Sequence, residues 1–134
     1  MTTSTPAAAL AITPTGETLG ATVEGLDLSK PLPAGTLAAM LRALGEYGVL
    51  RFPSQDLDAR ELRDFSAGLG ELEVNVANVH QEAGLPEVMT LSNMLVDGKP
   101  IGLADAGQDW HTDMSYSRGV AFANVLYALR VPRL

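Results

Sequence analysis

One nine-residue stretch holds most of the chemical information in this chain: Gln108-Asp109-Trp110-His111-Thr112-Asp113-Met114-Ser115-Tyr116. It contains His111, one of only two histidines, and it places Asp113 two positions later. In an extended chain, side chains at i and i+2 project from the same face, so this imidazole and carboxylate can converge on one small object. A first-row metal ion such as iron(II) suits the pair, because two histidines and one carboxylate form a facial triad with open positions for substrate and oxygen. The stretch therefore predicts two ligands of a metal site, and a third is still needed.

A purely structural interpretation of the same residues stays open. A bare His-x-Asp is a short pattern, and the two side chains can simply form a hydrogen-bonded pair. The other histidine, His80, lies in a segment with the composition of a loop, where we expect it to be solvated. It would become the third ligand only if its loop folded back onto His111 and Asp113.

Composition limits the class of protein. The chain has 134 residues, 46% hydrophobic and 19% charged, which is enough to bury the core of one soluble domain. Its net charge is -7 and its nine basic residues are scattered, so we expect neither a nucleic-acid nor a membrane partner. The absence of cysteine excludes disulfides and thiolate metal sites. With no signal peptide and no apolar stretch of membrane length, the expected location is the cytoplasm.

The hydrophobic pattern predicts two helices and several short strands, after a disordered tail over residues 1–9. The helices are expected over 36–47, where apolar residues recur on one face, and over 58–69, where Asp58 and Glu61 form a capping box and Gly70 can end the helix. The expected strands lie within 19–28, at 49–52, at 88–91 (buried) and at 120–131 (in the core), with a turn at Asp97-Gly98-Lys99-Pro100.

Five segments are specific when their order is taken together: Gly25-Leu26-Asp27-Leu28-Ser29-Lys30-Pro31-Leu32, Gly48-Val49-Leu50-Arg51-Phe52, Leu69-Gly70-Glu71-Leu72, Ser92-Asn93 with Gly98-Lys99-Pro100-Ile101-Gly102, and Trp110-His111-Thr112-Asp113. In this order they resemble the taurine dioxygenase family of iron(II)- and α-ketoglutarate-dependent oxygenases. The resemblance implies that His111 and Asp113 bind Fe(II) and that α-ketoglutarate is the cosubstrate. It also implies an α+β fold with part of a double-stranded β-helix (jelly roll) and flanking helices.

Members of this family continue beyond the equivalent of Leu134, to a Gly-Gly-Asp-Thr segment, a second histidine ligand and an arginine that pairs with the cosubstrate. The resemblance therefore implies a truncated fold, in which residues 10–134 are the N-terminal part of a taurine dioxygenase-like domain and the cosubstrate-binding residues lie elsewhere. Such a chain is expected to be inactive alone, unless a homo-oligomer or a complementing C-terminal half completes the site. The alternative is a non-catalytic remnant or interaction module of the same fold.

The resemblance also addresses the substrate, which it implies is a small organic molecule that the enzyme hydroxylates. Asn75 stands where taurine-specific members place a substrate-contacting histidine, which argues against taurine. Asn93, within one of the matching segments, is the second expected substrate-binding residue.

Overall fold

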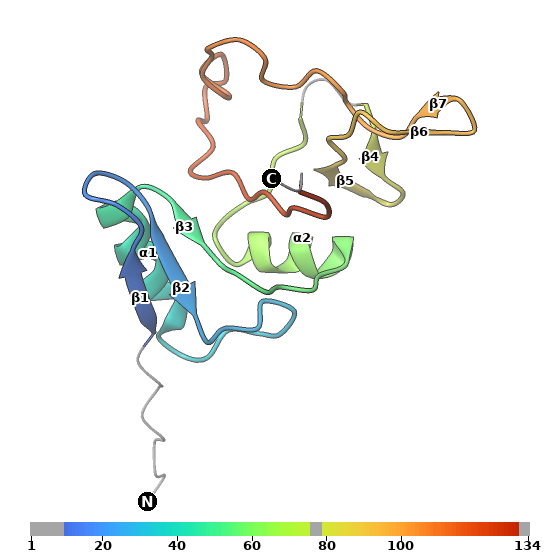
Figure 1. Ribbon diagram of the computed structural model, residues 1–134. Coiled ribbons are helices and arrows are strands. Elements are labelled where there is room, and N and C mark those ends of the chain that lie inside the picture. Colours follow the sequence, from blue (N-terminus) through green and yellow to red (C-terminus); the bar gives the residue numbers. More distant parts are fainter. Residues whose placement is uncertain (1–9, 76–78, 132–134) are drawn as a thin grey trace, which may run out of the picture. The chain divides into compact units, whose positions relative to one another are not determined.

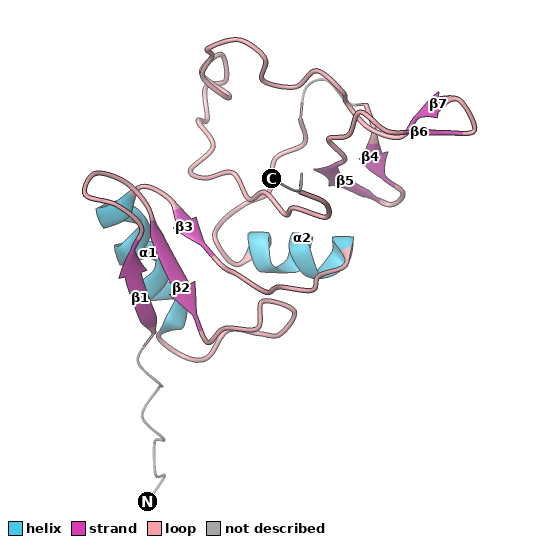
Figure 2. Ribbon diagram, viewed as in Figure 1, coloured by secondary structure: helices cyan, strands magenta, loops and turns pink. Residues whose placement is uncertain are grey.

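The computed structural model describes residues 10–75 and 79–131, so the expected disordered tail over 1–9 lies outside the described residues. The chain separates into two compact units, one up to Leu69 and one from Gly70 onward. The regular structure of the described residues consists of two helices and seven short strands (Figures 1 and 2). This mixture is an α+β arrangement, as the sequence predicts. None of the described helices is long and apolar enough to cross a membrane.

The first unit is built on a three-stranded sheet with the order β1-β2-β3. Strand β1 (Ala11–Pro14) pairs antiparallel with β2 (Ala21–Glu24), and β2 pairs parallel with β3 (Leu50–Arg51). Parallel neighbours need a long connection, which here contains helix α1 (Thr36–Tyr47), drawn along one face of the sheet in Figure 1. The sequence predicts β2 and β3 but not β1, because Ile12 is the only large apolar side chain in β1.

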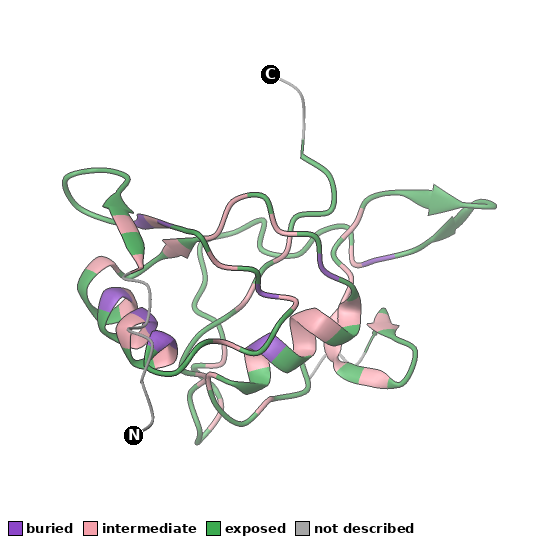
Figure 3. Cartoon of the chain, turned by 90° about the horizontal axis from the view of Figure 1, so that it is seen from below, coloured by how far each residue is buried: buried purple, intermediate pink, exposed green. Residues whose placement is uncertain are grey.

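Helix α1 spans the residues that its apolar stripe predicts. Met40 and Ala43 of its inner face are buried, as is Val23 of β2, and these side chains form much of the core of the unit. Figure 3 shows buried positions, in purple, on both helices. The helix stops at Gly48, whose φ of 70° is left-handed and whose N–H donates to the carbonyl of Leu44 at 2.8 Å. Glycine suits this position because its conformation is costly for other residues.

Helix α2 (Ala59–Ala67) begins with the predicted capping box. The N–H of Glu61 donates to Asp58 Oδ1 at 2.8 Å, and the N–H of Asp58 donates to Glu61 Oε2 at 2.8 Å. These bonds satisfy donors that a helix start otherwise leaves without partners. On the inner face, Phe65 is buried and meets Phe52 edge-on, with 6.0 Å between ring centroids.

The predicted end of α2 is wrong, because regular helix stops at Ala67 and not just before Gly70. The N–H of Gly68 donates to the carbonyl of Phe65 at 3.1 Å, and the N–H of Leu69 reaches three residues back at 3.0 Å. Bonds to the third residue back tighten a helix into a 3₁₀ turn. The last turn therefore closes before the glycine that the sequence offers as a stop.

Side-chain hydrogen bonds fix the loop that follows β2. The carboxamide of Gln55 donates to the carbonyl of Leu26 and accepts from the N–H of Leu28, both at 2.9 Å. In the same loop, a hydrogen bond from Lys30 is the main cause that lowers the pKa of Asp27 from 3.8 to about 2. This part of the family-like segment 25–32 is thus held by local polar contacts.

The second unit contains two small hairpins. Strand β4 (Gln81–Glu82) pairs antiparallel with β5 (Leu85–Met89), and β6 (Leu95–Val96) pairs antiparallel with β7 (Lys99–Pro100). The predicted turn joins β6 to β7, with φ of 50° at Asp97 and 73° at Gly98. Two successive positive φ values are the signature of a type I′ turn, which matches the twist of a hairpin.

One strand prediction in this unit is wrong, and another has the wrong bounds and burial. The apolar run 120–131 has no regular secondary structure, and Phe122, Leu126 and Leu129 are 69%, 82% and 77% exposed. A strand needs a neighbour to receive its backbone hydrogen bonds, and apolar composition alone does not supply one. The strand expected at 88–91 is shifted, since β5 ends at Met89 and is only half-buried.

Candidate metal centre

His111 and Asp113 lie side by side in the second unit. His111 Nε2 is 3.2 Å from Asp113 Oδ1. Their segment is irregular, neither helix nor strand, so the two side chains converge without the β-strand geometry that their spacing suggests. Trp110 is fully exposed, and Thr112 Oγ1 donates to Ser115 Oγ at 2.9 Å. The residues on either side of His111 therefore take no part in the pair.

A backbone hydrogen bond defines which histidine nitrogen is available. His111 Nδ1 lies 2.7 Å from the carbonyl oxygen of Asp109. A carbonyl oxygen only accepts, so Nδ1 carries the proton, and Nε2 of the neutral ring presents its lone pair. Nε2 faces Oδ1 of Asp113, and imidazole nitrogen and carboxylate oxygen are both common ligands of metal ions. The arrangement can therefore form an ion pair or hold a cation.

The other carboxylate oxygen of Asp113 has a partner of its own. Asn124 Nδ2 donates to Asp113 Oδ2 at 2.7 Å. Asn124 belongs to the apolar run 120–131, and the sequence offers only a weak signal for it, a lone carboxamide among apolar neighbours. The two oxygens of the carboxylate thus have different partners: Oδ2 accepts from Asn124, and Oδ1 is directed at His111.

Gly107 lies against the histidine ring. Its φ of +73° is left-handed, and a Cβ at this position would be 3.2 Å from His111 Cε1. Glycine alone combines this backbone conformation with so close an approach at little cost. The ring of His111 is therefore held by Gly107 on one side and by the carbonyl of Asp109 at Nδ1.

The donor atoms of the pair fit a divalent metal ion. Metal bonds to imidazole nitrogen and carboxylate oxygen of about 2.1 Å, at right angles, place the two donors about 3.0 Å apart. The observed separation of Nε2 and Oδ1 is 3.2 Å. The side chains of His111 and Asp113 are 51% and 58% exposed, which leaves room for further ligands.

The other candidate site residues are not part of the His111–Asp113 pair. His80 is exposed in a bend, as expected for a solvated loop histidine. Within residues 10–75 and 79–131, no three His, Cys, Asp or Glu side chains are placed to hold a metal ion together. Asn75 and Asn93 are exposed loop residues of the second unit, and their role in substrate binding stays a prediction.

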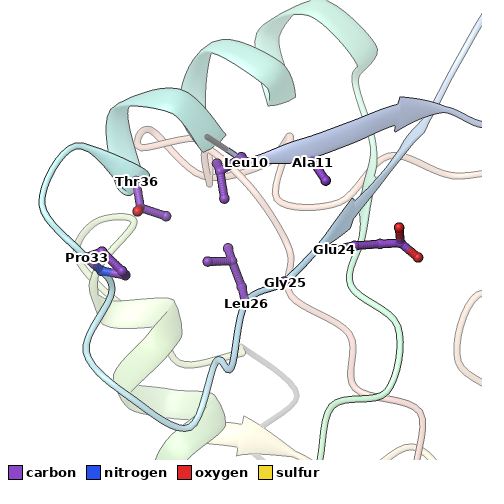
Figure 4. A pocket seen from close by; sticks show the side chains of 7 residues that line it. All are labelled: Leu10, Ala11, Glu24, Gly25, Leu26, Pro33 and Thr36. Atoms are coloured by element: carbon purple, nitrogen blue, oxygen red, sulfur yellow. The ribbon is translucent and has the colours of Figure 1, made fainter. Parts of the chain in front are cut away.

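A cavity in the first unit differs in its lining from the candidate metal centre. Leu10, Leu26 and Pro33 line it, together with Thr36, which contributes a hydroxyl. Glu24 lines it too, but Figure 4 shows its carboxylate directed away from Leu10 and Leu26. The cavity therefore presents mainly apolar surface and no pair of metal donors.

Comparison with known proteins identifies the family. A sequence model of the family described as "Taurine catabolism dioxygenase TauD, TfdA family" matches residues 11–133. This chain therefore belongs to that family of α-ketoglutarate-dependent dioxygenases, which confirms the resemblance carried by the five segments. A taurine dioxygenase from Burkholderia xenovorans has a similar solved structure, with a TM-score of 0.51 and 29% identity over 57% of this chain and 28% of that one.

Two curated proteins are similar to this chain in sequence. The chain is 32% identical to (S)-phenoxypropionate/alpha-ketoglutarate-dioxygenase of Delftia acidovorans, over 92% of this chain and 43% of that protein. It is 30% identical to pentalenolactone F synthase of Streptomyces arenae, over 87% of this chain and 40% of that protein. The chain therefore spans about two fifths of the length of the curated relatives it matches.

Proposed function

We propose that this chain supplies His111 and Asp113 as two of the three protein ligands of an iron(II) centre. The enzyme would be an α-ketoglutarate-dependent dioxygenase that hydroxylates a small organic substrate. The observation that carries the proposal is the 3.2 Å approach of His111 Nε2 to Asp113 Oδ1 inside the Trp110-His111-Thr112-Asp113 segment of a family member.

Iron(II) would be held by His111 Nε2 and Asp113 Oδ1 and, when bound with α-ketoglutarate, would supply the activation of molecular oxygen. The chain's own residues prepare these two atoms. The carbonyl of Asp109 keeps the proton of the neutral ring on Nδ1, so that Nε2 is free to bind. Asn124 holds Oδ2 of the carboxylate, so that Oδ1 stays directed at the same point as Nε2.

The remaining ligand is part of the proposal. A facial triad needs a second histidine, and the described residues bring two donors together. We propose that residues 10–134 form the N-terminal part of the domain, and that the second histidine and the α-ketoglutarate-binding groups belong to protein outside these 134 residues. A complementing C-terminal half or another copy in a homo-oligomer would supply them and complete the jelly roll. The 134-residue chain alone would then bind iron weakly and turn over no substrate.

The proposal also includes two substrate-binding residues, both asparagines. We propose that Asn75 and Asn93 contact the substrate, because both lie in exposed segments of the unit that carries His111 and Asp113. The resemblance places Asn75 where taurine-specific members have histidine. This difference argues against taurine as the substrate.

Metal binding tests the proposal most directly. Mn(II) is a redox-inert probe for such a site, and the free ion has an electron paramagnetic resonance signal that broadens on binding. The chain should bind one Mn(II) weakly, and His111→Ala or Asp113→Ala should abolish this binding. His80→Ala is the matched control, because it removes the other histidine from an exposed bend. Equal binding by wild type, His111→Ala and Asp113→Ala would overturn the proposed centre.

A second measurement tests the missing ligand. Anaerobic iron(II) and α-ketoglutarate give a visible charge-transfer band when a complete site binds both. The 134-residue chain should show no such band and should release no succinate in air. Succinate formed at enzyme-like rates, and lost in His111→Ala, would show that the chain completes its own site.

The exposed apolar run supports a second candidate function. Phe122, Leu126 and Leu129 are largely exposed, and clusters of exposed apolar side chains mark contact surfaces. An interaction module of the same fold would keep this surface while His111 and Asp113 formed only an ion pair. Such a module would bind no Mn(II) at the pair, so the same titration separates the two candidates.

A further inference from the structure

The carboxylate of Asp113 has two oxygens with different partners. Oδ1 lies 3.2 Å from His111 Nε2, and Oδ2 accepts from Asn124 Nδ2 at 2.7 Å. A separation of 2.7 Å is at the short end for N–H···O, as expected when the acceptor is charged. Asn124 follows Asp113 by eleven residues, so this bond joins two separate segments of the second unit.

The orientation of the Asn124 amide follows from its partner. A carboxylate only accepts hydrogen bonds, so the NH₂ group and not the carbonyl of Asn124 must face Asp113. The donor is also neutral. It therefore orients the carboxylate without adding a positive charge. A positive charge at this position would weaken the attraction of Oδ1 for a cation.

We propose that Asn124 is a positioning residue of the metal centre, which occupies Oδ2 of Asp113 so that the carboxylate binds the metal through Oδ1 alone. This inference rests on the proposed function. A carboxylate that binds through one oxygen takes one coordination position instead of two. More positions then stay open for the cosubstrate and oxygen. Hydrogen-bond partners of ligating carboxylates fix the orientation of the ligand in this way.

Two substitutions at position 124 and one control test the proposal. Asn124→Ala removes the donor, whereas Asn124→Gln keeps the carboxamide on an exposed side chain that has room to adjust. Gln108→Ala removes a different exposed carboxamide from the same unit. We expect Asn124→Ala to weaken Mn(II) binding by about tenfold, the lower end of the range for such partners. Asn124→Gln should restore affinity close to wild type, and Gln108→Ala should leave it unchanged.

A second readout needs no metal. The carboxyl ¹³C resonance of Asp113 in the metal-free chain reports its hydrogen bonds. It should shift in Asn124→Ala, return toward wild type in Asn124→Gln and stay in place in Gln108→Ala. A structural loss would instead change the circular dichroism and thermal transition of the variant. If Asn124→Ala does not fold, Asn124→Ser replaces it, because the hydroxyl is too short to reach Oδ2.

The outcomes separate this proposal from the one on which it rests. If His111→Ala and Asp113→Ala lose Mn(II) but Asn124→Ala binds it as wild type does, the metal centre stands and the role of Asn124 is overturned. If His111→Ala and Asp113→Ala also bind as wild type does, both proposals are overturned. A loss in Asn124→Ala that Asn124→Gln reverses, together with the matching ¹³C shifts, supports the proposal.

Discussion

Gly107 combines a left-handed backbone conformation with a close approach to the ring of His111. Its φ is +73°, the same value as at Gly98 in the β6–β7 turn, but the surroundings differ. A Cβ at position 107 would be 3.2 Å from His111 Cε1, whereas a Cβ at position 98 meets nothing within 4 Å. The two glycines therefore form a matched pair that separates backbone strain from contact with the ring.

We predict that Gly107→Ala and Gly98→Ala each lower stability by roughly 1–2 kcal/mol, because both force a side chain into the left-handed region. Only Gly107→Ala should also weaken Mn(II) binding, since its new Cβ must displace the ring of His111. Chemical denaturation measures the first effect and Mn(II) titration the second. Equal loss of Mn(II) affinity in both variants would show that general destabilisation, and not the ring contact, sets the affinity.

At the scale of single residues, the sequence indicates the two proposed metal ligands but not the residues that contact them. His111 and Asp113 are recognisable from their i, i+2 spacing and from the family-like segment around them. Gly107 and Asn124 are not, because a positive φ and a hydrogen bond across eleven residues are properties of the folded chain. For Asn124, the sequence offers one weak signal, which is that it is the single asparagine in an apolar run.

Helices and strands differ in how far their formation can be predicted from neighbouring residues in the sequence. Both helices are predictable, because an apolar stripe specifies α1 and a capping box specifies the start of α2 within a few residues. Strands depend on partners that sequence pattern does not identify. Strand β1 forms with little apolar pattern because it pairs with β2, while the strongly apolar run 120–131 forms no strand.

The capping box gives a prediction for α2. Asp58→Ala removes the acceptor of the Glu61 N–H and should lower the free energy of unfolding by about 1 kcal/mol, within the range of about 0.5–2 kcal/mol for such caps. Asp64→Ala is the matched control. It removes an exposed carboxylate from the same helix. This carboxylate pairs with the guanidinium of Arg63 at 3.0 Å. Exposed pairs contribute little, so its effect should stay below about 0.5 kcal/mol. Equal losses in urea denaturation would show that the loss of a negative charge, not the cap, matters.

For the whole molecule, the family was predictable from the ordered segments, but the distribution of the core was not. Every buried hydrophobic side chain in the described part of the chain lies between Ala21 and Phe65, in the first unit. The second unit, which carries His111 and Asp113, forms two hairpins and long irregular segments. The candidate site thus lies in the unit with less buried apolar surface.

This distribution predicts how the chain exchanges its amide hydrogens. Local opening requires little free energy where few apolar groups are buried, so amides of α1 and β2 should exchange slowly and those of residues 104–131 quickly. Mn(II) should slow exchange around His111 and Asn124, because a bound ion stabilises the conformation that holds it. Asp113→Ala should remove this effect and leave α1 unchanged. Mass spectrometry of peptic fragments resolves these segments. Uniform slow exchange across both units would contradict the prediction. It would require buried apolar side chains in the second unit, and the described residues bury them only in the first.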